Sequence, residues 1–312
     1  MALGSDHLTT SIAGNFIPEL WSDEVIGAYK SNLVIANLVT KLSHKGKKGD
    51  TIHIPVPSRG TASAKVAETQ VTLLASTNSV INVSIDQHYE YSKLIEDIAE
   101  VQSLASMRKF YTDDAGYALA KQVDTKLGTL WEGLQSGTVG GSDASSWETA
   151  YTINSGDTAL ELYTGNASNA RDITDVAIRA LNLKLDDADV PMDNRSLIIP
   201  PIAANDLLGI NRFTEQQYIG SGDAIATGKI GMIYGANVYI SSNCPTASDS
   251  TAPYNTDRVG VLLHKDALVL AEQLGVRSQT QYKQEYLGDL FTSDTIYGVA
   301  ELRNDAGVAF VV

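Results

Sequence analysis

The sequence has a single cysteine, Cys244, in 312 residues. One thiol excludes an intramolecular disulfide framework and a zinc site made of four cysteines. No stretch approaches the roughly 18 consecutive apolar residues of a membrane-spanning helix. The first residues show neither a basic start nor an apolar segment, so we expect no secretory signal. These absences favour a chain that folds in a reducing cytoplasm.

Basic side chains are scarce, with 23 Lys and Arg against 37 Asp and Glu, a formal net charge of −14. Affinity for phosphate comes mainly from clustered Lys and Arg, so tight binding to nucleic acid is not expected. One exception is a basic cluster formed by Lys41, Lys45, Lys47 and Lys48. It is interpreted as a solvated loop, and the alternatives are a contact with an acidic patch of a neighbouring subunit and a contact with nucleic acid.

Motifs of catalysis and metal binding are missing as well. The five histidines lack the HExxH spacing, and no GxSxG stretch occurs. The glycine-rich stretch at 220–235 does not have the spacing of a phosphate-binding loop. The acidic run from Asp186 to Asp193 lacks the glycine and the closing glutamate of a calcium-binding loop, and is interpreted as a helix-terminal loop. We therefore predict no enzymatic activity, no cofactor and no metal site.

Two alternating runs indicate a long β-hairpin of roughly forty residues. The first run contains Ile52, Ile54 and Val56, and the second contains Ile81 and Val83. The residues between them, 58–70, are mostly small and polar. A two-stranded hairpin is marginal alone in water, and no nearby helix is available to cover its apolar side. We therefore expect a partner chain to cover it.

Helical spacing predicts a first helix from about Trp21, which ends near Lys41, and a continuous helix over 94–134. At 1.5 Å per residue the second would be a rod of about 60 Å. Further on, short helices alternate with short strands, which favours an α+β arrangement. The expected elements are a hairpin within 151–162, helices over 174–185 and 203–208, strands over 196–199, 236–240 and 259–263, a helical turn over 265–272, and antiparallel strands with turns at Gly288 and 305–307. The apolar residues 308–312 predict a buried closing strand.

Several short stretches match one known family in the same order along the chain. They are FIPELW at 16–21, GDTIHIP at 49–55, ALA at 118–120 with Asp124, the run from Val190 to Pro200, and Tyr297 with Gly298. This order resembles the major capsid protein of tailed bacteriophages, whose Hong Kong 97-like shell fold is shared with encapsulins. The similarity covers about residues 16–312 and is lost in the insertion at 138–170.

The resemblance implies an α+β Hong Kong 97-like capsid fold with four parts. These are an N-terminal arm and short helix (1–45), an extended hairpin loop (46–92), a peripheral domain with a long spine helix (93–137 plus 251–312), and an axial domain (138–250, with the insertion 138–170). The implied function is a structural subunit that assembles through pentamers and hexamers into an icosahedral viral capsid around double-stranded DNA. The alternatives left open are an encapsulin-like nanocompartment shell, another virion component such as a tail or decoration protein, and an enzyme.

The resemblance also implies the partners and the location. The chief partner is the chain itself, and about fifteen residues before FIPELW leave no room for a fused scaffolding segment, so a separate scaffolding protein is expected. A portal and a decoration protein are further candidates, DNA would be enclosed but not gripped, and no membrane is involved. The location would be the virion, after assembly in the host bacterial cytoplasm. Candidate inter-subunit contact residues are Phe16, Trp21, Lys45, Lys47, Lys48, Ile52, Ile54, Arg59, Glu68, Ile81 and Val83.

Overall fold

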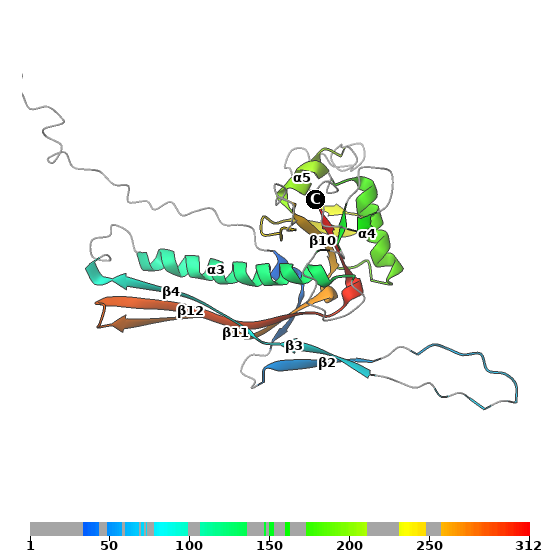
Figure 1. The fold of residues 1–312 in the computed structure, drawn as a ribbon, viewed down its shortest axis with the longest axis horizontal. Coiled ribbons are helices and arrows are strands. Elements are labelled where there is room, and N and C mark those ends of the chain that lie inside the picture. The colour runs from blue at the N-terminus through cyan, green and yellow to red at the C-terminus, as the bar shows by residue number, and fades with distance from the viewer. Residues whose placement is uncertain are drawn as a thin grey trace, which may run out of the picture.

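The structure is a computed structural model. Its described strands form three sheets, and a long helix lies along one of them (Figure 1). The structure describes residues 34–43, 49–57, 60–68, 70–71, 73, 78–98, 107–135, 147, 150–152, 160–162, 173–210, 231–247 and 257–312.

A four-stranded sheet forms the long body of the molecule, in the order β1-β11-β12-β4. Its strands are β1 (Thr40–Ser43), β11 (Leu268–Lys283), β12 (Gly288–Glu301) and β4 (Gln87–Glu96). The helix α3 (Met107–Thr129) lies along one face of this sheet, and the short helix α1 (Ile35–Leu38) lies beside α3 (Figure 1). β11 and β12 are long enough to need the register shifts between Glu272 and Arg277, which bend the sheet.

The second sheet has seven strands in the order β6-β5-β13-β10-β7-β9-β8. It is mixed, because β7 pairs in parallel with β9 and β13 with β5, while β10 is antiparallel to both of its neighbours. The helices α4 and α5 belong to this part of the molecule (Figure 1). The bounds are β5 (Tyr151–Thr152), β6 (Glu161–Leu162), α4 (Asp175–Asp187), β7 (Arg195–Ile199), α5 (Pro201–Leu208), β8 (Met232–Ile233), β9 (Ala236–Ile240), β10 (Val259–His264) and β13 (Gly307–Val311).

The third sheet is the predicted hairpin, in which β2 (Thr51–Pro57) pairs with β3 (Asn78–Ser84). Three single turns of 3₁₀-helix complete the structure, at η2 (Leu130–Gly133), η4 (Lys265–Ala267) and η5 (Asn304–Ala306).

One apolar core joins the two larger sheets. It contains residues of β11 and β12, such as Leu270 and Tyr297, together with residues of β10 and β13, such as Val261 and Phe310. The residues of β7, β10 and β13 are all buried, which explains their short apolar runs in the sequence. The prediction of a buried closing strand at the end of the sequence is confirmed.

Several short elements also agree with the sequence. β5 and β6 form the predicted antiparallel hairpin within 151–162. α4 begins at the predicted cap, where the Thr174 hydroxyl oxygen accepts a hydrogen bond from the amide of Ala177 at 3.3 Å. α5, β7, β9 and β10 lie at the predicted positions to within a few residues.

The predicted helix over 94–134 is wrong in its first part. Leu94 and Ile95 belong to β4, which pairs with β12 over ten residues, whereas Asp97 and Ile98 are helical and α3 covers Met107–Thr129. The 23 residues of α3 span about 35 Å. Apolar spacing cannot distinguish the two states at Leu94–Glu96, because pairing with β12 is what holds these residues extended.

Two smaller expectations are also corrected. The first helix was expected to end near Lys41, but Thr40–Ser43 is already a strand, β1, which pairs in parallel with β11. A helical turn was expected to reach Glu272, but only Lys265–Ala267 is helical and β11 begins at Leu268. β1 and β11 form strands because each supplies hydrogen-bonding partners to the other. A local sequence pattern does not contain this information.

Sheet membership cuts across the predicted domain boundaries. β10 and β13 come from residues 251–312, which were grouped with the long helix, yet they pair within the seven-stranded sheet. β4 crosses the boundary between residues 92 and 93 as one continuous strand. The four domain ranges therefore stay a prediction, and the sheets give a different division of these two segments.

Candidate inter-subunit surface

The base of the hairpin packs against its own chain. Val83 is fully buried in a small cluster with Val269 and Ala271 of β11, and Ile52 and Ile54 pack partly buried against the same cluster. The expectation that a partner chain must cover the apolar side of the hairpin is therefore wrong for its base. The cover comes from β11, a strand some 190 residues away in sequence, which the search for a nearby helix could not find. Among the candidate contact residues, Val83 is thus buried against its own subunit.

The far end of the hairpin projects away from the body (Figure 1). All of the described residues between 60 and 73 are exposed, and Glu68 lies there in a turn with φ of 62°. Three apolar side chains at this end have most of their surface in solvent: Val66 is 65% exposed, Val71 66% and Leu73 91%. The prediction of a polar end did not include them, although valine and leucine residues within a Ser/Thr/Ala-rich stretch were a readable signal.

The two outer edges of the hairpin differ in their hydrogen-bonding capacity. The amide of Ile85 donates to the Asp50 carbonyl at 2.7 Å, which fixes the alternation of the ladder. Hydrogen-bonded and non-hydrogen-bonded pairs alternate along the two strands, and Pro55 and Val80 form a non-hydrogen-bonded pair. The backbone nitrogens of such a pair point away from the partner strand. Pro55 and Pro57 therefore remove donors from the outer edge of β2, while Val80 retains its outward N–H on β3. β3 is the edge better suited to receive another strand.

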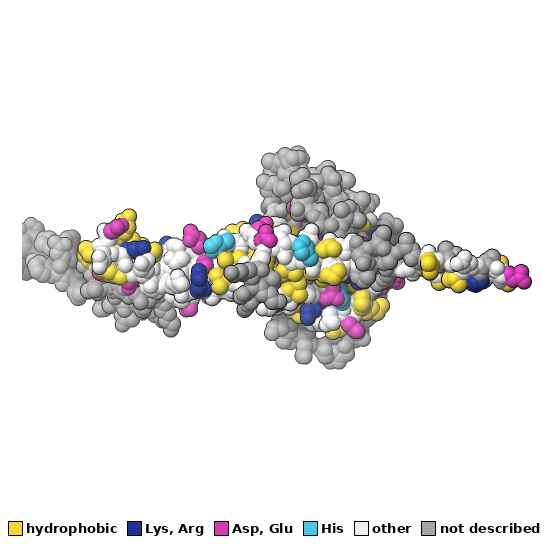
Figure 2. All heavy atoms as spheres, turned by 90° about the horizontal axis from the view of Figure 1, so that it is seen from below, with side chains coloured by type: hydrophobic (Ala, Val, Ile, Leu, Met, Phe, Trp, Pro, Cys, Tyr) yellow, Lys and Arg dark blue, Asp and Glu magenta, His cyan; other side chains and the backbone are white. Residues whose placement is uncertain are grey.

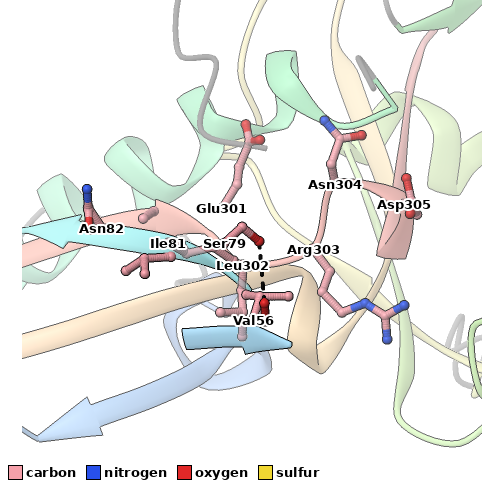
Figure 3. A pocket seen from close by; sticks show the side chains of 11 residues that line it. Val56, Ser79, Ile81, Asn82, Glu301, Leu302, Arg303, Asn304 and Asp305 are labelled. Carbon is pink, nitrogen blue, oxygen red and sulfur yellow. Dashed lines mark hydrogen bonds between the residues drawn. The ribbon is translucent and has the colours of Figure 1, made fainter. Parts of the chain in front are cut away.

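A groove of about 500 Å³ lies between β3 and the corner that follows β12 (Figure 3). Ile81 and Val80 line it from the hairpin side, and Leu302 lines it from the corner. The side chain of Asn304 points away from the groove, and its amide nitrogen donates to the Gly133 carbonyl at 2.8 Å (Figure 3). The candidate residue Ile81 is thus half-buried at a surface that combines apolar side chains with an available strand edge.

An ion pair joins three strands of the long sheet. Arg277 on β11 donates from Nε and Nη2 to the two carboxylate oxygens of Asp294 on β12, at 3.0 and 2.8 Å. His88 on β4 places Nε2 3.5 Å from the same carboxylate. The hydrogen bonds from Arg277 hold the pKa of Asp294 below its usual range, with a smaller contribution from His88 and an opposing one from burial.

The face of the molecule seen from below carries mixed charges (Figure 2). Among the described residues on that face, Lys and Arg side chains are interspersed with Asp and Glu and do not gather into one basic patch (Figure 2). Hydrophobic side chains are exposed between them (Figure 2). Such a face does not have the clustered cations that phosphate binding requires.

Six of the candidate contact residues lie outside the described residues: Phe16, Trp21, Lys45, Lys47, Lys48 and Arg59. The remaining five are on the hairpin, where Ile52, Ile54 and Ile81 are partly buried, Glu68 is exposed and Val83 is buried. Their roles in contacts between subunits stay a prediction. The structure brings Ile52, Ile54 and Val83 together in one cluster and leaves Glu68 apart from it at the far end.

Reactive and metal-binding chemistry has little support in the described part of the chain. No group of three or more His, Cys, Asp or Glu residues there could hold a metal ion. Cys244 is buried, and this burial raises the pKa of its thiol to about 12, so the reactive thiolate does not form near neutral pH. In the described ranges, no helix has the length and apolar character needed to cross a membrane.

Comparison with known proteins relates the chain to phage particles. No family model and no curated protein sequence matches it. Among solved structures it is similar to a chain of Mycobacterium phage Che8, with 23% identity, a TM-score of 0.73, and coverage of 95% of this chain and 97% of that one. It is similar to a chain in the capsid structure of the cyanophage P-SCSP1u, with 20% identity, a TM-score of 0.78, and coverage of 99% and 96%.

A third similar structure is the capsid of a native GTA particle, with 12% identity, a TM-score of 0.62, and coverage of 99% of both chains. The match in each case extends over nearly the whole chain, so the hairpin, the long helix and both large sheets share one arrangement with these proteins. The chain therefore has the α+β Hong Kong 97-like fold that its motif order resembles.

Proposed function

We propose that the chain is the structural subunit of an icosahedral viral capsid, which assembles through pentamers and hexamers and encloses double-stranded DNA. The proposal gives the chain no catalytic role. It rests on the fold and on surfaces that a single chain leaves incomplete, since fold alone does not determine function. Two of the similar structures are described by name as capsids.

The observation that carries the proposal is the far end of the hairpin. Its exposed Val66, Val71 and Leu73 lie on a projection with little contact to the rest of the chain (Figure 1). Burying such side chains contributes about 25 cal/mol per Å² of apolar surface, and in a lone subunit that contribution is lost. A neighbouring copy that receives the projection would recover it, and the contact would be heterologous, as closed rings require.

The same proposal covers the partners and the contact residues. The partners are further copies of the chain, a separate scaffolding protein, a portal and, as a further candidate, a decoration protein. The candidate residues that the hairpin leaves accessible, Glu68 and Ile81, would contact a neighbouring copy. Packaged DNA would be enclosed but not gripped, consistent with the net charge of −14. Assembly would take place in the cytoplasm of a host bacterium, and the product would be the virion shell.

Deleting residues 58–70 tests the proposal. The deletion removes much of the projection but leaves β2, β3 and the buried cluster around Val83, so we expect a folded subunit that no longer forms closed shells. Negative-stain electron microscopy measures the shells, and circular dichroism with urea denaturation measures the fold.

A full-length variant with Val66→Ser, Val71→Ser and Leu73→Ser keeps the loop length and should show the same loss of shells. Replacing the exposed Lys65 by Ser provides a matched control in the same loop, which should assemble normally. Closed shells of normal size from the deletion variant would contradict the role of the hairpin, whereas failure of the unaltered chain to form shells would contradict the proposal.

A further inference from the structure

A short segment crosses from α3 to the edge of the long sheet, and we call this segment, Val34–Ser43, the strap. It contains α1, which lies beside α3, and β1, which pairs in parallel with β11 (Figure 1). The strap lies in sequence between residues 1–33 and the hairpin that begins at Thr51. Its position on the body therefore sets where the chain leaves the body towards the hairpin.

The helix of the strap has no cap of its own. Its N-cap residue is Val34, which forms no side-chain hydrogen bond, and its first turn has no acidic residue. The first amides of a helix have no partner within the helix, and an aliphatic residue at the N-cap cannot accept from them. A four-residue helix such as α1 would not be expected to form alone.

Asp124 of α3 supplies the missing acceptor from 88 residues away. Its Oδ1 accepts from the amide of Ala36 at 2.9 Å, and its Oδ2 accepts from the amide of Ile35 at 3.3 Å. The residue is 1% exposed, so both oxygens are removed from water and depend on these donors. One carboxylate thus replaces the local cap that the strap does not have.

The charge of Asp124 is only partly compensated. Burial raises the pKa of its carboxyl, while the amides of Ala36, Ile35 and Val34 and the positive charge of Lys41 act in the opposite direction. Lys41 itself donates to the side-chain oxygen of Asn37 at 2.9 Å. A buried carboxylate is costly, and its position here is explained by the two backbone donors that it accepts from.

The strap borders a pocket on one side and is packed into the core on another. A cavity of about 340 Å³ separates part of it from α3 and the sheet, lined by Asn37 and Lys41 of the strap, Val123 of α3 and Glu272 of β11. Ile35 of α1 and Val39, the residue that follows α1, are buried in the main core, and Val34, Ala36 and Leu38 pack partly buried against it. The hydrogen bonds to Asp124 add a polar attachment at the N-terminus of α1 to this apolar packing.

We propose that Asp124 is a positioning residue, which fixes the strap on α3 and thereby sets where the chain leaves the body towards the hairpin. The consequence for shell assembly rests on the function proposed above. The contact itself belongs to the isolated subunit and can be measured without any shells.

Hydrogen–deuterium exchange of the full chain tests this contact, with Asp124→Ala and Asp124→Asn as the variants. Loss of a capping side chain should speed exchange in peptides of the strap by about 5- to 30-fold for Asp124→Ala. Asp124→Asn keeps one acceptor oxygen and should show a smaller increase. The matched control is Asp114→Ala on the same helix, because Asp114 accepts from the Tyr91 hydroxyl at 3.0 Å and ties α3 to β4 instead.

The result that supports the proposal is faster exchange confined to the strap, with peptides of β12 and β13 unchanged and no strap effect in Asp114→Ala. Unchanged exchange in the strap overturns it. Exchange that rises equally in the strap, β12 and β13 also overturns it, because Asp124 would then support only global stability. If Asp124→Ala does not fold, Asp124→Asn provides the same comparison.

Negative-stain microscopy adds the assembly readout. Asp124→Ala should give fewer closed shells than Asp114→Ala at equal concentrations of folded subunit, and equal yields would overturn the consequence for assembly. If the unaltered chain forms no shells at all, the proposed function fails, while the exchange experiment still decides the role of Asp124.

Discussion

Asp294 and Asp124 are both buried aspartates, and their surroundings shift their pKa in opposite directions. Asp294 receives two hydrogen bonds from the charged guanidinium of Arg277, and its pKa is lowered. Asp124 receives neutral backbone amides, burial is the largest influence on it, and its pKa is raised. The difference follows from the donor, because a charged donor offsets the loss of water around a carboxylate far better than an amide does.

Replacing Asp294 by Asn should change how stability depends on pH. Because the pKa of Asp294 is lower in the folded chain than in the unfolded one, its contribution is present above the unfolded value of about 3.9 and is lost as pH falls through the folded value. We therefore expect Asp294→Asn to be less stable than the unaltered chain at neutral pH, with a difference that narrows below about pH 4. Urea denaturation across this range measures it.

Asp124→Asn serves as the control of opposite sign. A raised folded pKa contributes stability below the unfolded value, and this contribution is lost as pH rises through the folded value. As pH rises from acid to neutral, the unaltered chain should therefore lose stability relative to Asp124→Asn, whereas it should gain stability relative to Asp294→Asn. Parallel pH profiles for the two variants would contradict both assignments.

Single residues were only partly predictable from the sequence. The acidic run was correctly interpreted as a helix-terminal loop, and the structure adds that Asp186 accepts from Arg195 at 2.6 Å, which the sequence did not indicate. Asp124 was noticed only as part of a family motif. Its partners are backbone amides, and any residue type provides those, so no side-chain pattern could identify them.

At the scale of elements, β3 offers a clean test of strand addition. Val80→Pro removes an outward N–H, whereas Ile81→Pro removes an inward one that the ladder to β2 needs. If a neighbouring copy pairs with β3, Val80→Pro should leave the subunit folded but reduce shell formation. Ile81→Pro should destabilise the hairpin itself by about 1–3 kcal/mol.

Microscopy and urea denaturation of the two variants separate these effects. Normal shells from Val80→Pro would show that the outer edge of β3 is not used in assembly. The comparison is strict because the two substitutions are adjacent and place the same residue type in the same strand.

Elements with a clear local signal were predicted, and those held by distant partners were not. The alternating runs of β2 and β3 and the capped helix α4 are encoded locally and agree with the structure. β4 was mistaken for helix because its last residues have helical apolar spacing, while its conformation depends on β12, some 200 residues later. The burial of Val83 depends in the same way on β11.

At the scale of the whole molecule, the shared core predicts that both large sheets unfold together. Phe310 is fully buried on β13 and faces Gly260 on β10, so Phe310→Ala should lower the free energy of unfolding by about 3–5 kcal/mol. The matched control is Phe110→Ala on α3, where the ring is 44% exposed and a much smaller change is expected.

Tryptophan fluorescence and far-ultraviolet circular dichroism provide two probes of this unfolding. Coincident transitions are expected, since residues of both sheets contribute to one cluster. Two separated transitions, with only one shifted by Phe310→Ala, would show instead that the sheets are independent units.

The position of β13 has a consequence for the timing of synthesis. This strand lies in the interior of its sheet, between β5 and β10, although it is formed by residues 307–311. A ribosome must therefore translate nearly all of these 312 residues before that sheet can close. Nascent chains and products of premature termination would expose the apolar residues of the incomplete sheet to proteases and chaperones. Folding order alone would then act as quality control, admitting only copies that have been translated through β13.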